Sequence, residues 1–290
     1  MSPKAVDLPQ EVLDGLTEQT RVCLTRLAVH APELTLTPSA APRTRLAAVL
    51  ALLFERDGKL RVLLTTRSKA LRSHPGQTAL PGGKVDEGDE SVAGTALREA
   101  HEEVSLPLSS PHVHVLTALH PFISAARLIV TPVVAFLSSP SLLSGLKANK
   151  GEVDRIFSYP LEAMIEPEFA REEELVGKGE DWPYDEELYH VDDYPSQYSG
   201  AYRYHRLRSC ASPVMGLTAD ILMSVAEIAY ARKTAFERWP SGQLVGVERV
   251  RKILEIELGK EAEMSVVRAE KLNNHLELGA DEADTATPAV

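Results

Sequence analysis

The sequence predicts an α+β protein, an α/β/α sandwich built around a mixed central sheet. Apolar runs of strand length, such as residues 127–137, predict buried strands. Segments with apolar residues three and four positions apart, such as residues 216–233, predict amphipathic helices. The elements follow the order strands, helix, strands, helix, and this order favours one sheet with helices packed against it.

Taken in order, the chain begins with an amphipathic pattern over residues 9–30 that predicts one helix. Asp57-Gly58 lies between two apolar runs and predicts a hairpin turn. A helix is expected over residues 90–104, with Asp89 as its N-cap. The predicted strands are 45–54, 59–67, 113–120, 127–137, 152–159 and 201–208, and the other predicted helices are 160–165, 216–233 and 244–258.

We divide the chain into three parts. Residues 1–41 are expected to form an N-terminal helical arm, residues 42–233 the main domain, and residues 234–290 a C-terminal helix followed by a disordered tail. An acidic insertion at about 166–196 interrupts the main domain. The formal net charge of the chain is −11, and twelve acids against two bases give residues 166–195 alone a charge of −10.

Composition and charge exclude several classes of protein. An acidic chain is a poor candidate for nonspecific nucleic-acid binding, although its nearly neutral remainder does not exclude an anionic small-molecule substrate. No apolar run approaches 18 residues and the N-terminus lacks the features of a signal peptide, so we expect neither a membrane span nor secretion. Cys23 and Cys210 lie far apart without metal-ligand spacing, which indicates reduced thiols.

Clustered carboxylates distinguish the helix predicted over residues 90–104. Glu99, Glu102 and Glu103 are three and four positions apart, so their side chains lie together and repel one another near the C-terminal end of the helix, which disfavours acids. Arg98 can pair with Glu102, which would leave Glu99 and Glu103 unpaired. A hard cation such as Mg²⁺ would satisfy these carboxylates, and a solvated charged face is the alternative.

A glycine-rich loop leads directly into this helix. Residues 74–90, HPGQTALPGGKVDEGDE, contain Gly76, Gly82, Gly83 and Gly88. Glycine turns before a helix allow backbone N–H groups to approach anions. A loop of this kind followed by a carboxylate helix favours a site for a complex of metal and diphosphate.

Residues 83–106 resemble the Nudix box, whose usual form is G-x5-E-x7-R-E-U-x-E-E-x-G-U, with U apolar. Glu90, followed after seven residues by Arg98 and the three glutamates, matches this form without a gap. Two departures exist: six residues separate Gly83 from Glu90, and Ser105 replaces the late glycine. The six-residue spacer is the one found in the coenzyme A branch of the family.

A second signature of that branch lies just upstream. It has the form LLT-x-R-[SA]-x3-R-x3-G-x3-[FL]-P-G-G, and residues 63–83, LLTTRSKALRSHPGQTALPGG, match it throughout. The resemblance to the coenzyme A diphosphatase branch of the Nudix hydrolases covers roughly residues 42–233. It implies the Nudix fold, with the catalytic loop-helix motif beside the mixed sheet.

The resemblance also implies an activity, namely metal-dependent hydrolysis of the diphosphate bond of coenzyme A and its derivatives to 3′,5′-ADP and (acyl-)4′-phosphopantetheine. It implies Mg²⁺ or Mn²⁺ as cofactor and a small molecule as partner, with neither nucleic acid nor membrane. The implied residues fall into three groups: Glu99, Glu102 and Glu103 as metal ligands, with Glu99, Glu103, Arg98 and Glu152 in catalysis; Arg67, Arg72, Gly82, Gly83 and Lys84 in substrate binding; and Glu90, Gly76 and Pro81 as structural positions.

Two alternatives stay open. A Nudix diphosphatase could act on oxidised nucleotides, nucleotide sugars or ADP-ribose, and only the upstream signature argues against this. A Nudix-fold binding module without turnover is the other alternative, although no glutamate of the box is lost. We expect a cytoplasmic protein. Relatives of this branch are often peroxisomal, but the chain ends in PAV rather than in a Ser-Lys-Leu type of signal.

Overall fold

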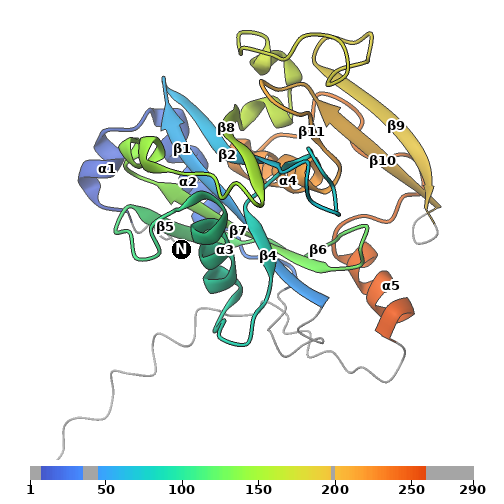
Figure 1. The fold of residues 1–290 in the computed structure, drawn as a ribbon, viewed down its shortest axis with the longest axis horizontal. Coiled ribbons are helices and arrows are strands. Elements are labelled where there is room, and N and C mark those ends of the chain that lie inside the picture. Colours follow the sequence, from blue (N-terminus) through green and yellow to red (C-terminus); the bar gives the residue numbers. More distant parts are fainter. Residues whose placement is uncertain (1–7, 35–44, 197–199, 259–290) are drawn as a thin grey trace, which may run out of the picture.

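A mixed eight-stranded sheet forms the centre of the molecule (Figure 1). The computed structural model describes residues 8–34, 45–196 and 200–258. The central strands β1 (Leu46–Arg56) and β7 (Ile129–Leu137) pair in parallel. All other pairs in the sheet are antiparallel, and they involve β2 (Lys59–Arg67), β3 (Thr78–Ala79), β4 (Gly82–Lys84), β5 (Val113–Ala118), β6 (Phe122–Ile123) and β8 (Val153–Pro160).

Helices cover both faces of this sheet. The helix α3 (Val92–Val104) packs on one face, and α2 (Glu18–Ala28) and α4 (Gly216–Tyr230) pack on the other. Short turns of 3₁₀ helix connect the strands at Pro140–Gly145, Glu162–Met164 and Pro167–Ala170. This arrangement confirms the predicted α+β sandwich with a mixed sheet.

The side chains of β1 alternate between the two faces of the sheet, each of which is covered by helices. Ala48, Leu50 and Leu52 contact the core beneath α3, while Ala51 and Leu53 belong to the core shared with α2 and α4. Successive side chains of a strand point to opposite faces, so a strand buried on both faces is continuously apolar. The turn after β1 also follows the prediction, because Asp57 and Gly58 have φ angles of 53° and 70° and join paired strands.

The N-terminal region differs from its prediction in two ways. The single helix expected over residues 9–30 is divided into α1 (Gln10–Asp14) and α2, because the chain turns at Gly15 and Thr17 then caps α2 through a hydrogen bond from the Thr20 backbone N–H. Leu24 and Leu27 are fully buried in the main core. The described part of the predicted arm is therefore integral to the fold.

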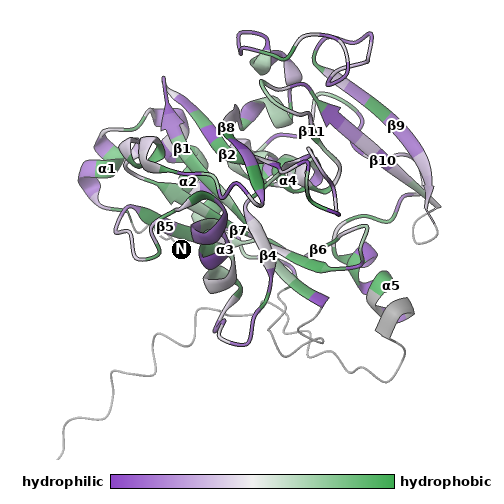
Figure 2. Cartoon of the chain, viewed as in Figure 1, coloured by the Kyte–Doolittle hydropathy of each residue, from purple (hydrophilic) through white to green (hydrophobic). Residues whose placement is uncertain are grey.

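A second, antiparallel sheet contains part of the acidic segment. It has the order β11 (Val214–Met215), β10 (Gly200–Leu207), β9 (Tyr189–Ser196), and β9 was not predicted. Figure 2 shows that β10 and much of β9 are hydrophilic. Asp192 and Asp193 of β9 form salt bridges with arginines of β10, which explains how acidic residues occupy a strand.

The C-terminal region is anchored by α5 (Gly246–Leu258), close to the predicted range 244–258. Val247 and Val250 pack in a small core with Leu46, Val85 and Ile129. The predicted disordered tail lies outside the described residues, as do residues 1–7 of the predicted arm. No described helix has the length and apolar character that crossing a membrane requires.

Protonation of His205 is expected to destabilise the second sheet. His205 is fully buried, with its Nε2 2.9 Å from the Arg238 carbonyl oxygen and its Nδ1 2.8 Å from the Tyr189 hydroxyl oxygen, so a neutral ring can donate to the carbonyl and accept from the hydroxyl. Burial lowers the pKa of His205 from 6.5 to about 4. The neutral form of His205 therefore makes its full contribution to the stability of the fold above pH 6.5. This contribution is lost as the pH falls towards 4, because the unfolded chain takes up the proton more readily.

We expect about 2 kcal/mol of this contribution to disappear between pH 7.5 and pH 5. Urea denaturation at both pH values measures the loss. A His205→Asn variant should lack this part of the pH dependence, and equal pH dependence in both proteins would contradict the assignment.

Candidate active site

The carboxylate helix begins at a cap other than the predicted one. Ser91 is the N-cap of α3 and accepts a hydrogen bond of 3.0 Å from the Gly94 backbone N–H. At the other end Ser105 has a φ angle of 59°, in the left-handed conformation that glycine prefers after a helix. This explains why the box usually has a glycine at this position.

Asp89 joins the loop to the helix, a role that the sequence assigned to Glu90. Its carboxylate accepts hydrogen bonds from Arg98 Nε at 3.0 Å and Nη2 at 2.9 Å, from Thr95 Oγ1 and from the Asp86 backbone N–H. The Arg98 guanidinium is the main reason why the pKa of Asp89 falls to about 2. Glu90 is exposed, so the bracing predicted for it belongs to its neighbour.

Arg98 also contacts the glutamates that follow it. Its Nη1 lies 3.0 Å from Glu99 Oε1 and 3.2 Å from Glu102 Oε1, and its Nη2 donates to the Lys84 carbonyl. Glu99 is therefore paired, contrary to the prediction that Arg98 would leave it free. One guanidinium thus orients two carboxylates against β4.

Glu103 lies deepest in the site. It is 7% exposed, and the Gly82 backbone N–H donates to its Oε2 at 3.4 Å. The pKa of Glu103 is raised to about 7, mainly by burial, with the Gly82 hydrogen bond and the charge of Arg67 lowering it and the charges of Glu99 and Glu152 raising it. Burial likewise raises the pKa of Glu99, to which Glu102 and Glu152 also contribute. These mutual effects indicate that the carboxylates of Glu99, Glu103 and Glu152 lie near one another.

Glu152 lies in the turn before β8, close to the end of α3. The Ser68 backbone N–H donates to its carbonyl, which ties it to the end of β2, and Asn149 links the same turn to the Glu103 carbonyl. The Glu152 side chain is exposed at the rim. Glu152 is predicted in catalysis because it starts a predicted strand in a family-like segment, and these hydrogen bonds link its turn to the end of α3.

The predicted substrate-binding side chains differ in their exposure to solvent. Arg67 is half-buried at the end of β2, with its Nε 3.4 Å from the Ser73 carbonyl, and Arg72 is exposed on the same loop. The Lys84 side chain is exposed at the end of β4. Two predicted structural residues shape the turns here: Gly76 has a φ angle of 71°, and the buried Pro81 accepts a hydrogen bond from the Leu50 backbone N–H.

Gly82 and Gly83 lie so close to neighbouring atoms that an added Cβ would clash with them. A Cβ on Gly82 would lie 2.4 Å from the Ala48 carbonyl oxygen, and a Cβ on Gly83 would lie 2.4 Å from Glu99 Oε1. Because β4 pairs with β1 at these residues, the glycines allow strand and helix to approach together.

A Gly83→Ala substitution should displace Glu99 without unfolding the protein. The clash falls on the end of a flexible side chain, which can rotate away. We expect about a 10- to 100-fold loss of kcat/KM, with a melting temperature near that of the wild type. Steady-state kinetics and thermal melting check this, and unchanged kinetics would show that the position of Glu99 is unimportant.

The glutamates fit a divalent metal by their chemistry. Glu99, Glu102, Glu103 and Glu152 offer oxygen ligands, which Mg²⁺ and Mn²⁺ prefer, and the buried Glu103 has no cation within salt-bridge distance among the described residues. No three His, Cys, Asp or Glu side chains of the described ranges already stand at chelating positions. The donor set therefore suits the ion, and its side chains would adjust on binding.

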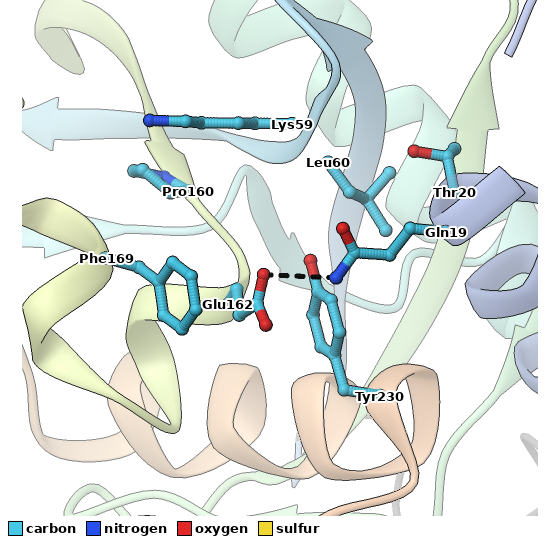
Figure 3. Close-up of a pocket in the computed structure, with 8 residues that line it drawn as sticks. All are labelled: Gln19, Thr20, Lys59, Leu60, Pro160, Glu162, Phe169 and Tyr230. Carbon is cyan, nitrogen blue, oxygen red and sulfur yellow. Dashed lines mark hydrogen bonds between the residues drawn. The ribbon is translucent and has the colours of Figure 1, made fainter. Parts of the chain in front are cut away.

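A separate cavity of 170 Å³ lies at the other end of β2 (Figure 3). Its lining includes Lys59, Tyr230 and Glu162, and the Glu162 carboxylate accepts hydrogen bonds from Gln19 and Arg232. Lys59 and Arg67 are at opposite ends of a nine-residue strand, about 27 Å apart. The cavity is therefore not part of the candidate active site.

Comparisons with known proteins identify the family of this chain. The NUDIX domain family matches residues 44–176. Nudix hydrolase 22, chloroplastic, of Arabidopsis thaliana is 36% identical over 231 residues, which cover 78% of this chain and 68% of that protein. The chain belongs to the Nudix hydrolase family. The glutamates of α3 and the loop before them lie within the residues that the family matches.

Two further relatives of this Nudix hydrolase have different locations. Nudix hydrolase 15, mitochondrial, of Arabidopsis thaliana is 40% identical over 191 residues, 66% of this chain and 60% of that protein. Peroxisomal coenzyme A diphosphatase NUDT7 of Mus musculus is 32% identical over 190 residues, 65% of this chain and 72% of that protein. The chain thus spans about 60% of the length of the mitochondrial relative, and the names do not agree on one compartment.

Proposed function

We propose that the protein hydrolyses the diphosphate bond of coenzyme A and its derivatives to 3′,5′-ADP and (acyl-)4′-phosphopantetheine. The observation that carries this proposal is the match of residues 63–83 to the coenzyme A signature, in the same chain as a complete set of box glutamates. The coenzyme A diphosphatase among the relatives supports it. We keep the cytoplasm as the expected location.

The residues of the site have different proposed roles in this reaction. Mg²⁺ or Mn²⁺, when bound by Glu99, Glu102 and Glu103, would neutralise the diphosphate and acidify the attacking water. Arg98 holds Glu99 and Glu102 in place. Glu152, whose charge acts on the buried Glu103 and the partly buried Glu99, is our candidate to accept the proton from water.

Arg67 and Arg72 are proposed to bind the phosphates, because a guanidinium can donate two parallel hydrogen bonds to a phosphate group. The charge of Arg67 already reaches Glu103, which is consistent with a phosphate lying between them. Gly82, Gly83 and Lys84 would form the floor beneath this phosphate.

Product analysis tests the proposed function. The purified protein is incubated with coenzyme A and either Mg²⁺ or Mn²⁺, and chromatography detects 3′,5′-ADP and 4′-phosphopantetheine. Cleavage of ADP-ribose or an oxidised nucleotide in place of coenzyme A would support a Nudix hydrolase with another substrate. Absence of cleavage of all these compounds, together with absence of metal binding, would support a binding module.

A further inference from the structure

The side chains of β10 divide between two faces of the second sheet. His205 and Leu207 are fully buried on one face. Tyr202, Tyr204 and Arg206 alternate with them and lie on the other face, which is partly exposed. We call these three residues the inner face of β10.

The inner face of β10 lies near β3, the strand that precedes Gly82 and Gly83. Thr78 of β3 donates through Oγ1 to the Ser212 carbonyl at 2.6 Å, and Thr218 of α4 donates through Oγ1 to the Thr78 carbonyl at 3.3 Å. Tyr204 packs against Gly216, where a Cβ would lie 3.0 Å from its hydroxyl oxygen. The second sheet is therefore fixed beside the loop that carries Arg67 and Arg72.

The helix α5 brings a cation to the same place. The guanidinium carbon of Arg249 lies 4.9 Å from the centre of the Tyr202 ring. The neighbouring Val250 packs in one small core with Val85, the residue that follows β4. In the sheet, β4 is separated from β6, which α5 contacts, by three strand positions or about 14 Å. Through the core that Val250 shares with Val85, α5 therefore lies beside the segment that follows Gly82 and Gly83.

Arg249 differs from the other arginines near this face. Arg206 forms a salt bridge of 2.6 Å with Asp192, and Arg238 forms one with Glu227. No carboxylate within the described part of the chain forms a salt bridge with Arg249, and its Nε is buried without a hydrogen-bond acceptor there. The charge of Arg249 lowers the pKa of the buried Asp220, but these two described residues form no salt bridge. The Asp220 carboxylate instead accepts a hydrogen bond of 2.7 Å from the Tyr202 hydroxyl.

A guanidinium held by an aromatic ring, with donors to spare, suits a phosphate group. Resting on the proposed function, we propose that Arg249 binds the 3′-phosphate of coenzyme A, with the adenosine against the inner face of β10. The scissile diphosphate would then lie at Arg67 and Glu103, and the 3′-phosphate would lie on the opposite side of the nucleoside. This contact would make the enzyme prefer coenzyme A to dephospho-coenzyme A.

Ligand binding tests this assignment independently of turnover. The full chain is titrated calorimetrically with adenosine 3′,5′-diphosphate and with AMP, which lacks the 3′-phosphate, both in the presence of Mg²⁺. We expect the wild type to bind the first ligand at least about ten-fold more tightly, as one charge-assisted phosphate contact provides. Arg249→Gln should remove most of this preference and Arg249→Lys should keep part of it.

Arg251→Gln is the matched control, because Arg251 is exposed on the same helix. It should keep the full preference. An equal preference in Arg249→Gln and the wild type, or none in the wild type, would overturn the assignment. If Arg249→Gln does not fold, as judged by thermal melting, an Arg249→Lys protein with an unreduced preference would overturn it, and a reduced preference would support it.

The same variants separate this inference from the proposed function. Failure to cleave coenzyme A, with an Arg249-dependent preference for adenosine 3′,5′-diphosphate, would refute the function and leave the phosphate site standing. Equal cleavage of coenzyme A and dephospho-coenzyme A by the wild type would leave the function standing and overturn the role of Arg249.

Discussion

Replacing Glu103 with Gln should lower kcat for diphosphate hydrolysis at least about 1,000-fold, a loss of about 4 kcal/mol in stabilisation of the transition state. Glu103 is the most buried of the box glutamates and receives the Gly82 N–H. Gln has nearly the same shape but carries no charge, so it should occupy the same space without holding a divalent cation. Initial rates of 3′,5′-ADP formation measure the loss.

The same substitution should stabilise the metal-free protein at alkaline pH. The pKa of Glu103 is raised from 4.5 to about 7 by burial, so its contribution to stability is complete below pH 4.5 and is lost as the pH rises through 7. At pH 8 with a chelator, the buried carboxylate should cost about 3 kcal/mol, and Glu103→Gln should melt several degrees higher than the wild type. At pH 5 the difference should shrink.

The matched control for both measurements is Glu180→Gln, because Glu180 is exposed in the acidic segment. It should change neither kcat nor the melting temperature. A Glu103→Gln protein with a tenth or more of the wild-type activity would show that this carboxylate is not essential. An unchanged melting temperature with chelator at pH 8 would show that its burial carries no such cost.

The sequence was sufficient where one local rule decides the structure. Continuous apolar runs predicted β1 and β7 because both faces of these strands are covered. The spacing of the glutamates placed Glu99 and Glu103 at one end of α3 because a helix fixes neighbours three and four positions apart. The turn at Asp57-Gly58 followed from the preference of this pair for positive φ.

The sequence was insufficient where contacts between distant residues decide the structure. The acidic strand β9 pairs its charges with arginines of β10, and those partners are not visible in the acidic segment itself. Motif spacing favoured Glu90, whereas the fold turns Asp89 towards Arg98. Arg249, which we propose for the 3′-phosphate, was not predicted because it lies far from both motifs in the sequence and is positioned only by the packing of α5.

A Gly82→Ala substitution should damage the fold rather than the chemistry alone. A Cβ at this position would lie 2.4 Å from the Ala48 carbonyl oxygen and 2.6 Å from Val49 Cα. Both are backbone atoms of β1 in the middle of the sheet, so they cannot rotate away as the Glu99 side chain can. The pairing of Val49 with Gly82 would have to open.

We expect this opening to cost about 3 kcal/mol of unfolding free energy, or to prevent folding, because overpacking a core typically costs up to that amount. Urea denaturation followed by circular dichroism measures it. Gly88→Ala is the matched control, since its Cβ would meet nothing within 4 Å, and it should change stability by less than about 0.5 kcal/mol. If the two variants were equally stable, β1 and β4 could separate freely, and the close approach that places the Gly82 N–H on Glu103 would not be fixed by the sheet.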